Sequence, residues 1–364
     1  MEWLRAGAVG VKRRVAVLGA GGLVGQRFVF LLANHPWFRL ELLTGSEKSA
    51  GARYGDIVEW AIETPMPEKV RDLEVHETSP DLIAREGVEI AFSALPAEIA
   101  REVELELARR GVVVVSNASN MRLDPDVPLL NPEVNADHIE VIEEQRRRRE
   151  WSGAIVKVPN CTTAILTLSL KPLLDEFGVR RVIVSTMQAV SGAGLRGLPS
   201  MAILDNIIPY IEGEEEKVEK ETLKILGSVE AGEVKPRSDI KVSATCCRVP
   251  VLEGHTESVF VELGRRASLE EVARALAEFP GNKIRGLNLP SKPEKPIVVR
   301  REPNRPQPRL DRLEGNGMSV VVGRLRVDEA LGGVKYVVLG SNTIRGAAGT
   351  GVLIAELMAR LGLA

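Results

Sequence analysis

The chain has 364 residues, a length that corresponds to about two domains. Its 44% hydrophobic and 27% charged residues are typical of a packed globular protein, and a net charge of −2 argues against a broad nucleic-acid-binding surface. The sequence contains no run of about 18 apolar residues, so we expect no membrane-spanning helix.

Cysteine and histidine are scarce, with three and four copies. Three cysteines, of which Cys246 and Cys247 are adjacent, are too few for a disulfide framework. The spacing of cysteines and histidines nearly excludes a structural zinc site, so we expect no metal. No apolar segment of signal-peptide type precedes Arg13 and Arg14, so a reduced, cytoplasmic location is expected. Thiol or imidazole chemistry must therefore come from a short list of side chains.

The first half of the chain alternates predicted strands and helices. Four apolar runs of strand length lie at residues 14–19, 40–44, 88–93 and 112–116. Helices are predicted at residues 23–33 and from about 96 to 110. This alternation predicts an α/β fold that begins with a Rossmann-type domain, in which helices cover both faces of a parallel sheet.

The pattern changes near Pro159, where the predicted strands become longer and alternate apolar with polar residues. These strands lie at residues 181–189, 241–250, 256–263, 319–325 and 334–340. Predicted helices lie at residues 162–177, about 215–226, and 269–278, where Ser268 and Glu271 form a capping box. Such a pattern predicts an α+β domain with an antiparallel or mixed sheet that has one wet face. Residues 287–311, rich in proline and charge, are expected on the surface, and a final helix is predicted at 347–361.

A glycine-rich turn joins the first strand to the first helix. Gly19, Gly22 and Gly25 are spaced GxxGxxG, which differs from the strict GxGxxG pattern. Glycine lets the backbone approach a pyrophosphate, and the helix start that includes Leu23 and Val24 offers free N–H groups. The position directly after a buried strand favours a dinucleotide-binding turn over an ordinary strand–helix connection.

The end of the second strand indicates which dinucleotide binds. An NAD site usually places an acidic residue there, on the ribose 2′-hydroxyl. Here the strand is followed by Ser46, Glu47, Lys48 and Ser49. Two hydroxyl groups and a lysine suit a 2′-phosphate, although Glu47 would repel this phosphate if its side chain pointed inward. The sequence therefore favours NADP over NAD as the cofactor.

The candidate nucleophile is Cys161, which follows Pro159 and Asn160 at the start of a predicted helix. A helix N-terminus stabilises a thiolate, so we expect a lowered pKa for Cys161 and nucleophilic chemistry. The alternative is a buried structural cysteine. Cys246 and Cys247 lie within a predicted strand, where we expect one of them to be buried and neither to have a chemical role.

A cysteine mechanism needs a group that accepts and donates protons. His255 follows Gly254 at a strand junction in the second half of the chain and is the leading candidate. The other three histidines lie at helix ends, in loops or in a polar stretch; they are His35, His76 and His138.

Seven ordered motifs together resemble the aspartate-semialdehyde dehydrogenase family, in particular its archaeal and fungal type. The resemblance covers essentially the whole chain after about residue 13. The motifs are VAVLGAGGLVGQ at 15–26, SNASNMR at 116–122, PNCTTA at 159–164, MQAVSGAG at 187–194, IEGEEEK at 211–217, CRVPVLEGHTE at 247–257 and NTIRGAAGTG at 342–351.

The resemblance implies roles for the catalytic and cofactor-binding residues. Cys161 would form an acyl thioester, His255 would be the acid/base, and Gln188 would orient the substrate beside the thioester. Further residues that would contact the cofactor are Ser93, Leu95, Ser191, Gly192 and Asn342, together with the glycine turn and Ser46, Lys48 and Ser49.

The resemblance also implies a substrate site. Arg248 would bind the α-carboxylate with its guanidinium fork, and Glu214 would pair with the amino group. Lys217, together with Arg122 and Asn120, would bind the phosphate. Without the resemblance, the glutamates at 214–216 would be an ordinary acidic helix start, and which of the three meets the amine stays open.

The implied reaction is the reduction of L-aspartyl-4-phosphate by NADPH to L-aspartate 4-semialdehyde and phosphate, a step in the biosynthesis of lysine, threonine, methionine and isoleucine. One alternative is a reductase of malonyl-CoA or succinyl-CoA on the same scaffold. Others are another phosphate-linked aldehyde dehydrogenase and a non-enzymatic NADP-binding regulator. The presence of Glu214, Lys217 and Arg248 favours aspartyl phosphate, because a CoA thioester would not need an amine-binding glutamate.

The expected domain division follows from these assignments. Residues 1–160 and 342–364 would form the dinucleotide-binding domain, since the last helix is expected to return to it. Residues 161–341 would form the catalytic and oligomerisation domain. The family resemblance implies a homodimer or homotetramer, with small molecules as the other partners and neither nucleic acid nor membrane among them.

Overall fold

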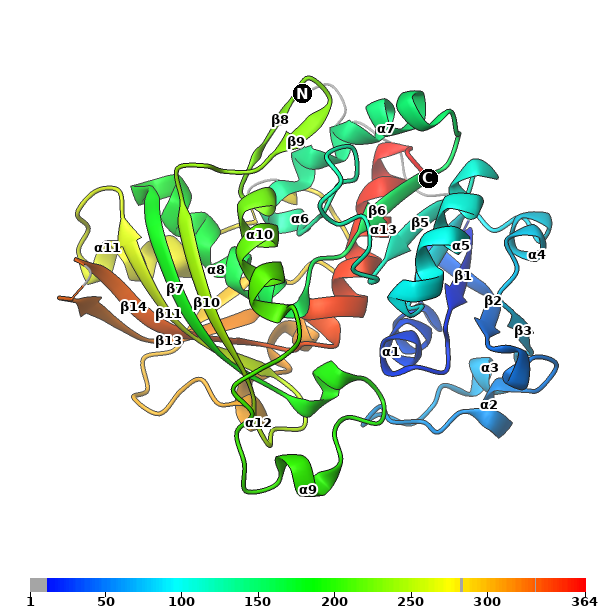
Figure 1. Cartoon of the computed structure of the whole chain (residues 1–364), viewed down its shortest axis with the longest axis horizontal. Helices are drawn as coiled ribbons and strands as arrows, with labels where there is room; N and C mark the ends of the chain where they lie inside the picture. The colour runs from blue at the N-terminus through cyan, green and yellow to red at the C-terminus, as the bar shows by residue number, and fades with distance from the viewer. Residues whose placement is uncertain (1–11, 282–283, 331) are drawn as a thin grey trace.

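Two six-stranded sheets organise the computed structural model, which describes residues 12–281, 284–330 and 332–364 (Figure 1). The first eleven residues of the expected dinucleotide-binding domain therefore lie outside the described residues. Helices cover both faces of the first sheet, whereas the helices Cys161–Phe177, Glu214–Ile225 and Leu269–Ala277 pack on one face of the second. The α/β class with a second, mixed sheet is confirmed.

The first sheet is parallel and has the strand order β3-β2-β1-β4-β5-β6. Its strands are β1 (Arg13–Leu18), β2 (Phe38–Gly45), β3 (Val75–Glu77), β4 (Ile90–Ser93), β5 (Val113–Ser116) and β6 (Ala154–Lys157). Its helices are α1 (Leu23–Leu32), α2 (Tyr54–Ile57), α3 (Glu68–Arg71), α4 (Pro80–Arg85), α5 (Ala97–Arg109), α6 (Pro132–Asn135) and α7 (Val141–Arg149). The order reverses between β1 and β4, and ligands of such sheets bind outside the carboxyl ends of the strands at that point.

The second sheet is mixed and has the order β10-β7-β11-β14-β13-β12, with parallel pairs at its two edges. Its strands are β7 (Val179–Gln188), β10 (Lys241–Arg248), β11 (His255–Leu263), β12 (Ile297–Val299), β13 (Val320–Asp328) and β14 (Gly333–Gly340). The associated helices are α8 (Cys161–Phe177), α9 (Ser200–Ile203), α10 (Glu214–Ile225), α11 (Leu269–Ala277) and α12 (Pro308–Asp311), and β8 (Ser228–Glu230) pairs with β9 (Glu233–Lys235) in a small hairpin.

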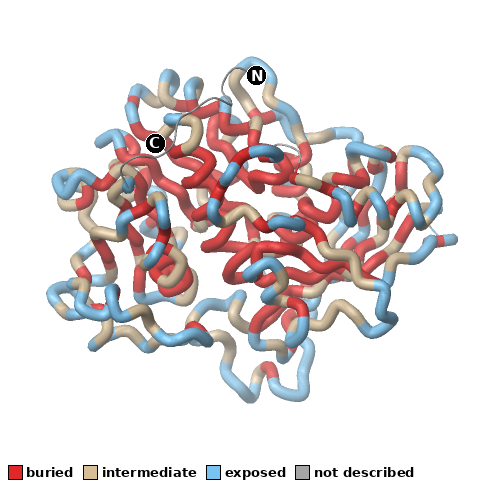
Figure 2. Tube along the Cα trace, turned by 180° about the vertical axis from the view of Figure 1, so that it is seen from behind, coloured by how far each residue is buried: buried red, intermediate tan, exposed pale blue. Residues whose placement is uncertain are grey.

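One face of the second sheet is left open. Along β7 the side chains alternate, so that Val182 and Val184 are buried under the helices while Ile183 and Met187 are 40% and 38% exposed. Figure 2 shows the same division, with buried chain running through the strands of both sheets and exposed chain concentrated in the connections. The prediction of a sheet with one buried and one exposed face, made from the alternation of apolar and polar residues, is therefore confirmed.

The last helix, α13 (Gly349–Leu361), crosses back to the first sheet and packs in its core beside α1 and β5. A π-helical turn at Ile344–Ala348 precedes it. Figure 1 shows this helix between the two halves of the molecule. Within the described ranges, we find no helix that is both long and apolar enough to span a membrane.

The expectation that residues 287–311 lie on the surface is wrong in part. Leu287 and Leu289 are buried in the core of the first sheet, and Ile297 is buried in β12 at the edge of the second. These apolar side chains are isolated between prolines and charged residues, so no periodic pattern marks them as core. The predicted capping box of α11 is confirmed, because Ser268 and Glu271 exchange both bonds.

Candidate active site

The site is built at the start of α8, where the chain leaves the first sheet and enters the second. Asn160 caps this helix, since its Oδ1 accepts from the Thr162 and Thr163 N–H groups at 3.0 and 3.2 Å. This bond pattern fixes Cys161 as the first helical residue. Strand β6 ends at Lys157, three residues before the cap residue Asn160.

Cys161 and His255 lie in direct contact. The Cys161 Sγ is 3.2 Å from His255 Nε2, and the Ala189 backbone N–H donates to His255 Nδ1 at 3.1 Å. Because a backbone N–H can only donate, Nδ1 must be the unprotonated nitrogen. The proton of the neutral ring therefore sits on Nε2 and faces the sulfur.

Three candidate residues share one row across the second sheet. Arg248 on β10 lies opposite Gln188 at the end of β7, and the register of β11 places His255 next to Gln188 on the other side. All three are buried, and Arg248 Nη1 donates to the Ala189 carbonyl at 2.8 Å. Gly192 closes over this row, because a Cβ at its position would lie 2.5 Å from Arg248 Nη1. Strand register thus brings together residues that lie up to 67 positions apart in the chain.

Helix α10 supplies acidic and basic groups from one face. Glu214 is buried and its Oε1 accepts from Asn160 Nδ2 at 2.9 Å, while Lys217 Nζ lies 3.8 Å from Glu214 Oε2. Glu215 instead accepts from the Cys246 N–H on β10, and Glu216 is exposed. Among the three consecutive glutamates, only Glu214 is directed at the residues around Cys161.

Glu221 is a buried residue of this site that the sequence analysis missed. One of its oxygens accepts from Arg122 Nη1 at 2.9 Å and the other accepts from the Asn160 N–H at 2.7 Å. It therefore ties the expected phosphate-binding arginine to the cap of the nucleophile's helix. The signal was available, because Glu221 follows Glu214 by seven residues and so lies on the same helix face.

Asn120 is held by a buried lysine. Lys157 Nζ donates to Asn120 Oδ1 at 3.0 Å and pairs with Glu104 at 2.5 Å. The Ser93 hydroxyl donates to the same Glu104 at 2.8 Å. The Ser93 side chain is therefore turned into the domain, so that only its backbone could meet a cofactor, and Leu95 beside it is also buried.

The π-helical turn before α13 packs against the nucleophile. A Cβ at Gly346 would lie 2.6 Å from Cys161 Cβ, so only glycine allows this approach. The neighbouring Arg345 is fully buried and forms a two-bond ion pair with Glu133 at 2.9 and 2.5 Å. π-helical turns occur frequently at functional sites. The sequence analysis gave Arg345 and Gly346 no role, because neither contact is local in the chain.

The expectation of a lowered pKa for Cys161 is wrong for this structure. Burial and the nearby Glu214 carboxylate raise the pKa of Cys161 to about 12, against the opposing effects of Arg248 and the Thr162 N–H. Burial and the charge of Arg248 lower the pKa of His255 to about 3. The resting pair is therefore a neutral thiol and a neutral imidazole, because the helix start is too weak to outweigh desolvation.

This assignment predicts how Cys161 reacts with iodoacetamide. We expect the alkylation rate to rise about tenfold per pH unit, without a plateau, from about pH 6 to pH 10, because the thiolate fraction grows in this way below a pKa of about 12. Mass spectrometry of the peptide that carries Cys161 measures the rate. Glu214→Gln should accelerate the reaction, since this carboxylate raises the thiol pKa. A plateau near neutral pH would contradict the neutral pair and indicate a thiolate–imidazolium pair.

The glycine turn has the features of a phosphate site. Gly19 has φ +74°, and a Cβ at Gly25 would lie 2.1 Å from the Gly19 carbonyl oxygen. Nothing lies within 4 Å of the Cβ position of Gly21, so the turn faces open space. Helix α1 has neither a side-chain cap nor an acidic residue in its first turn, which leaves the Leu23, Val24 and Gly25 amides without intrahelical acceptors.

The other expected cofactor residues fall into two groups. At the end of β2, Ser46 and Lys48 are exposed and Ser49 is half-buried, with its hydroxyl donating to the Ser46 carbonyl. Glu47 is also exposed. On the catalytic side, Asn342 Nδ2 donates to Ser191 Oγ at 2.9 Å, which places these two residues together near Gly192.

Two other kinds of site receive no support. The part of the chain that the structure describes contains no group of three histidine, cysteine or acidic residues that could hold a metal ion.

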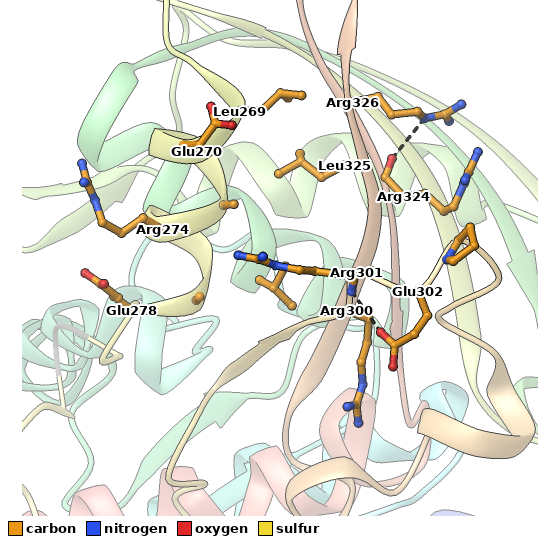
Figure 3. A pocket seen from close by; sticks show the side chains of 14 residues that line it. Leu269, Glu270, Arg274, Glu278, Arg300, Arg301, Glu302, Arg324, Leu325 and Arg326 are labelled. Carbon is orange, nitrogen blue, oxygen red and sulfur yellow. Dashed lines mark hydrogen bonds between the residues drawn. The ribbon is translucent and has the colours of Figure 1, made fainter.

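A hollow of about 780 Å³ lies between α11, β12 and β13 and is lined by several arginines. Figure 3 shows that Arg274 points away from the hollow on one side, while Arg324 and Arg326 point away on the other. Their guanidinium groups do not converge on one ligand position.

Comparison with known proteins first defines the class. A family profile described as "Semialdehyde dehydrogenase, NAD binding domain" matches residues 14–142, and one described as "Semialdehyde dehydrogenase, dimerisation domain" matches residues 170–345. The two halves of the chain are therefore those of a semialdehyde dehydrogenase.

Full-length relatives narrow the class. "Aspartate-semialdehyde dehydrogenase" of Methanothermobacter thermautotrophicus is 54% identical over 345 residues, which cover 94% of this chain and 98% of the relative. A crystal structure of the Candida albicans aspartate semialdehyde dehydrogenase with NADP superposes with a TM-score of 0.89 at 42% identity, covering 97% of this chain and 100% of that chain. The chain belongs to the aspartate-semialdehyde dehydrogenase family. A "Malonyl CoA reductase (NADP)" of Metallosphaera sedula is 40% identical, with 96% of this chain and 97% of the relative covered.

Proposed function

We propose that this protein reduces L-aspartyl-4-phosphate to L-aspartate 4-semialdehyde with NADPH, through a thioester on Cys161. The observation that carries the proposal is the 3.2 Å contact between Cys161 Sγ and His255 Nε2, beside Arg248, Glu214 and Arg122. Membership of the family supports the same reaction and NADP as the cofactor.

Four charged side chains of the site match the three charged groups of aspartyl phosphate. Arg248 has donors left for the α-carboxylate, because only Nη1 is engaged by the Ala189 carbonyl. Glu214 is the buried carboxylate that can pair with the amino group. Arg122 and Lys217 would bind the phosphate, with Asn120 beside Arg122 in the same loop. The family resemblance implies these roles, and the charges of the side chains and the burial of Arg248, Glu214 and Arg122 support them.

The residues present fit a dinucleotide. The open glycine turn and the uncapped start of α1 would hold the pyrophosphate, and Ser46, Lys48 and Ser49 would meet a 2′-phosphate. Ser191, Gly192 and Asn342 would contact the end that lies near Cys161. When bound, NADPH supplies the hydride that reduces the thioester.

The first step transfers the acyl group to sulfur. The Sγ–C bond forms, the bond from the acyl carbon to the phosphate oxygen breaks, and the thiol proton leaves with the departing phosphate. His255 donates its Nε2–H toward the reacting oxygen and sulfur, which fits the tautomer imposed by the Ala189 N–H. Because Asn160 already engages the Thr162 and Thr163 N–H groups, the Cys161 amide is the remaining first-turn donor for the oxyanion.

The second step releases the aldehyde. Reduction of the thioester leaves an oxyanion that the same donors stabilise. Its collapse breaks the C–S bond and returns a thiolate, which the Nε2–H of His255 solvates until it takes up a proton from solvent. His255 therefore acts as a hydrogen-bond donor in both steps of the cycle.

The test is an assay with two substrates. We expect phosphate-dependent reduction of NADP with L-aspartate semialdehyde, and little oxidation of NADPH with malonyl-CoA. The malonyl-CoA reductase relative makes this the relevant rival. Succinic semialdehyde, which lacks the amino group, should react at least about tenfold more slowly, because Glu214 would then lack its cation. Preference for malonyl-CoA would overturn the proposal.

We further infer how the chain is divided and assembled. Residues 1–160 with 342–364 and residues 161–341 form the two domains, supported by two largely separate apolar cores and by the place of α13 in the first, although Leu287 and Leu289 of the second range pack in the first core. The open face of the second sheet, with Ile183 and Met187, would join two copies in a homodimer or a larger homo-oligomer. Three free thiols suit a cytoplasmic location.

A further inference from the structure

A buried ion pair joins the nucleotide-binding helix to the segment that carries His255. Arg27 belongs to α1, which starts at the glycine turn, and its Nη2 lies 3.2 Å from Glu253 Oε2. Both side chains are almost fully buried, and 226 residues separate them in the sequence. Figure 1 shows α1 on the side of the first sheet that faces the second. The pair therefore crosses between the two halves of the molecule.

Glu253 also joins its own segment to residues 341–343, which precede the π-helical turn and α13. Its second oxygen accepts from the Ser341 hydroxyl at 2.8 Å and from the Thr343 hydroxyl at 2.5 Å. The next residue, Gly254, donates its N–H to Asn342 Oδ1 at 2.8 Å. His255 follows immediately, so the position of its ring depends on a segment held at two consecutive residues.

The same pair lines the space beside the expected cofactor site. A cavity of about 440 Å³ is lined by Leu23 of the glycine turn, by Ser191, by Leu252, and by Arg27 and Glu253 themselves. A ligand that reaches from the turn toward Cys161 would pass this pair. The proposed reaction uses neither charge. Burial of two charges costs free energy unless the ion pair is well aligned and makes further hydrogen bonds.

We propose that Glu253 is a positioning residue, which together with Arg27 sets the placement of His255 and Cys161 relative to the bound dinucleotide. This inference rests on the proposed function, since it concerns the geometry of hydride transfer. Misplacement of reacting groups by about 1 Å can cost roughly 100-fold in rate. Loss of the pair should therefore slow the reductive step and leave acyl transfer and binding largely intact.

The test compares Glu253→Gln and Arg27→Gln with a matched control. Glu63 contacts Arg27 at 3.1 Å and is hydrogen-bonded to Glu253, so it belongs to the same cluster; the control is Glu102→Gln, which changes an exposed glutamate on α5. We expect Glu253→Gln to lower kcat about 10- to 100-fold and to raise the primary isotope effect with NADPH deuterated at the transferred position. The KM for L-aspartate semialdehyde should change less than about threefold. Glu102→Gln should behave like the wild type.

Further measurements separate positioning from folding. If the pair acts as a unit, the kcat of the double variant Arg27→Gln/Glu253→Gln should be no lower than that of either single variant. The conservative variant Arg27→Lys should restore part of kcat. Thermal unfolding reports any loss of folded protein. The proposal is overturned if Glu253→Gln lowers only the melting temperature, while kcat per folded enzyme and the isotope effect match those of Glu102→Gln. Absence of NADP-dependent turnover in the wild type would instead contradict the proposed function.

Discussion

Cys161→Ser should lower kcat roughly 10⁴-fold or more, on the scale seen when a covalent enzyme loses its nucleophile. The sulfur is the only thiol in contact with His255, and a serine hydroxyl at this position would be a far weaker nucleophile with no base beside it. The glycine turn is built from other residues, so the dissociation constant for NADP should stay within about twofold. Steady-state kinetics and titration of NADP binding measure the two effects.

The matched control is Cys247→Ser. Cys247 lies on β10 and pairs with Met187, so its side chain belongs to the open face of the second sheet rather than to the row that contains Arg248. This variant should keep its turnover. In the wild type, L-aspartate semialdehyde with NADP and without phosphate should leave an aspartyl group on Cys161 that a mass spectrum detects. Comparable turnover in Cys161→Ser would exclude the thioester route.

Arg248→Lys should have the second-largest effect. We expect kcat/KM for L-aspartate semialdehyde to fall roughly 10- to 100-fold, since charged hydrogen bonds are worth about 1.5–3 kcal/mol each. Lysine keeps the charge but cannot hold the Ala189 carbonyl and a carboxylate at the same time with a planar fork. The dissociation constant for NADP should be unchanged.

A substrate without the α-carboxylate tests the assigned role of Arg248. The wild type should prefer L-aspartate semialdehyde over 3-aminopropanal, and Arg248→Lys should lose most of this preference. Arg101→Lys, an exposed position on α5, is the control and should match the wild type. If the variant slowed both aldehydes equally, Arg248 would serve the reacting atoms and not the carboxylate.

Local patterns in the sequence were sufficient to predict much of the fold. The buried runs of the first half and the alternating strands of the second set the two sheets, because burial on two faces or on one leaves a direct trace in the order of apolar residues. The glycine turn could also be predicted, because its glycines are close neighbours in the chain. Strands of three residues, such as β3, are too short to carry such a pattern.

Contacts across the fold could not be predicted in this way. Glu221, Lys157 and Arg345 are placed by partners on other elements, and their own sequence neighbourhoods resemble ordinary charged segments. Isolated apolar residues such as Leu287 also gave no signal, since a single side chain has no period. Their burial depends on which surfaces the topology brings together.

The sequence by itself determined the kind of chemistry, through a cysteine at a helix start, a histidine after a glycine and a glycine turn after a buried strand. Only the tertiary structure decided the protonation states and the orientation of these groups. A pKa depends on the solvent and charges removed from or brought to a group in space, so burial and Glu214 raise the pKa of Cys161 although the helix start predicts the opposite. The tautomer of His255 likewise depends on the Ala189 N–H, 66 residues away in the chain.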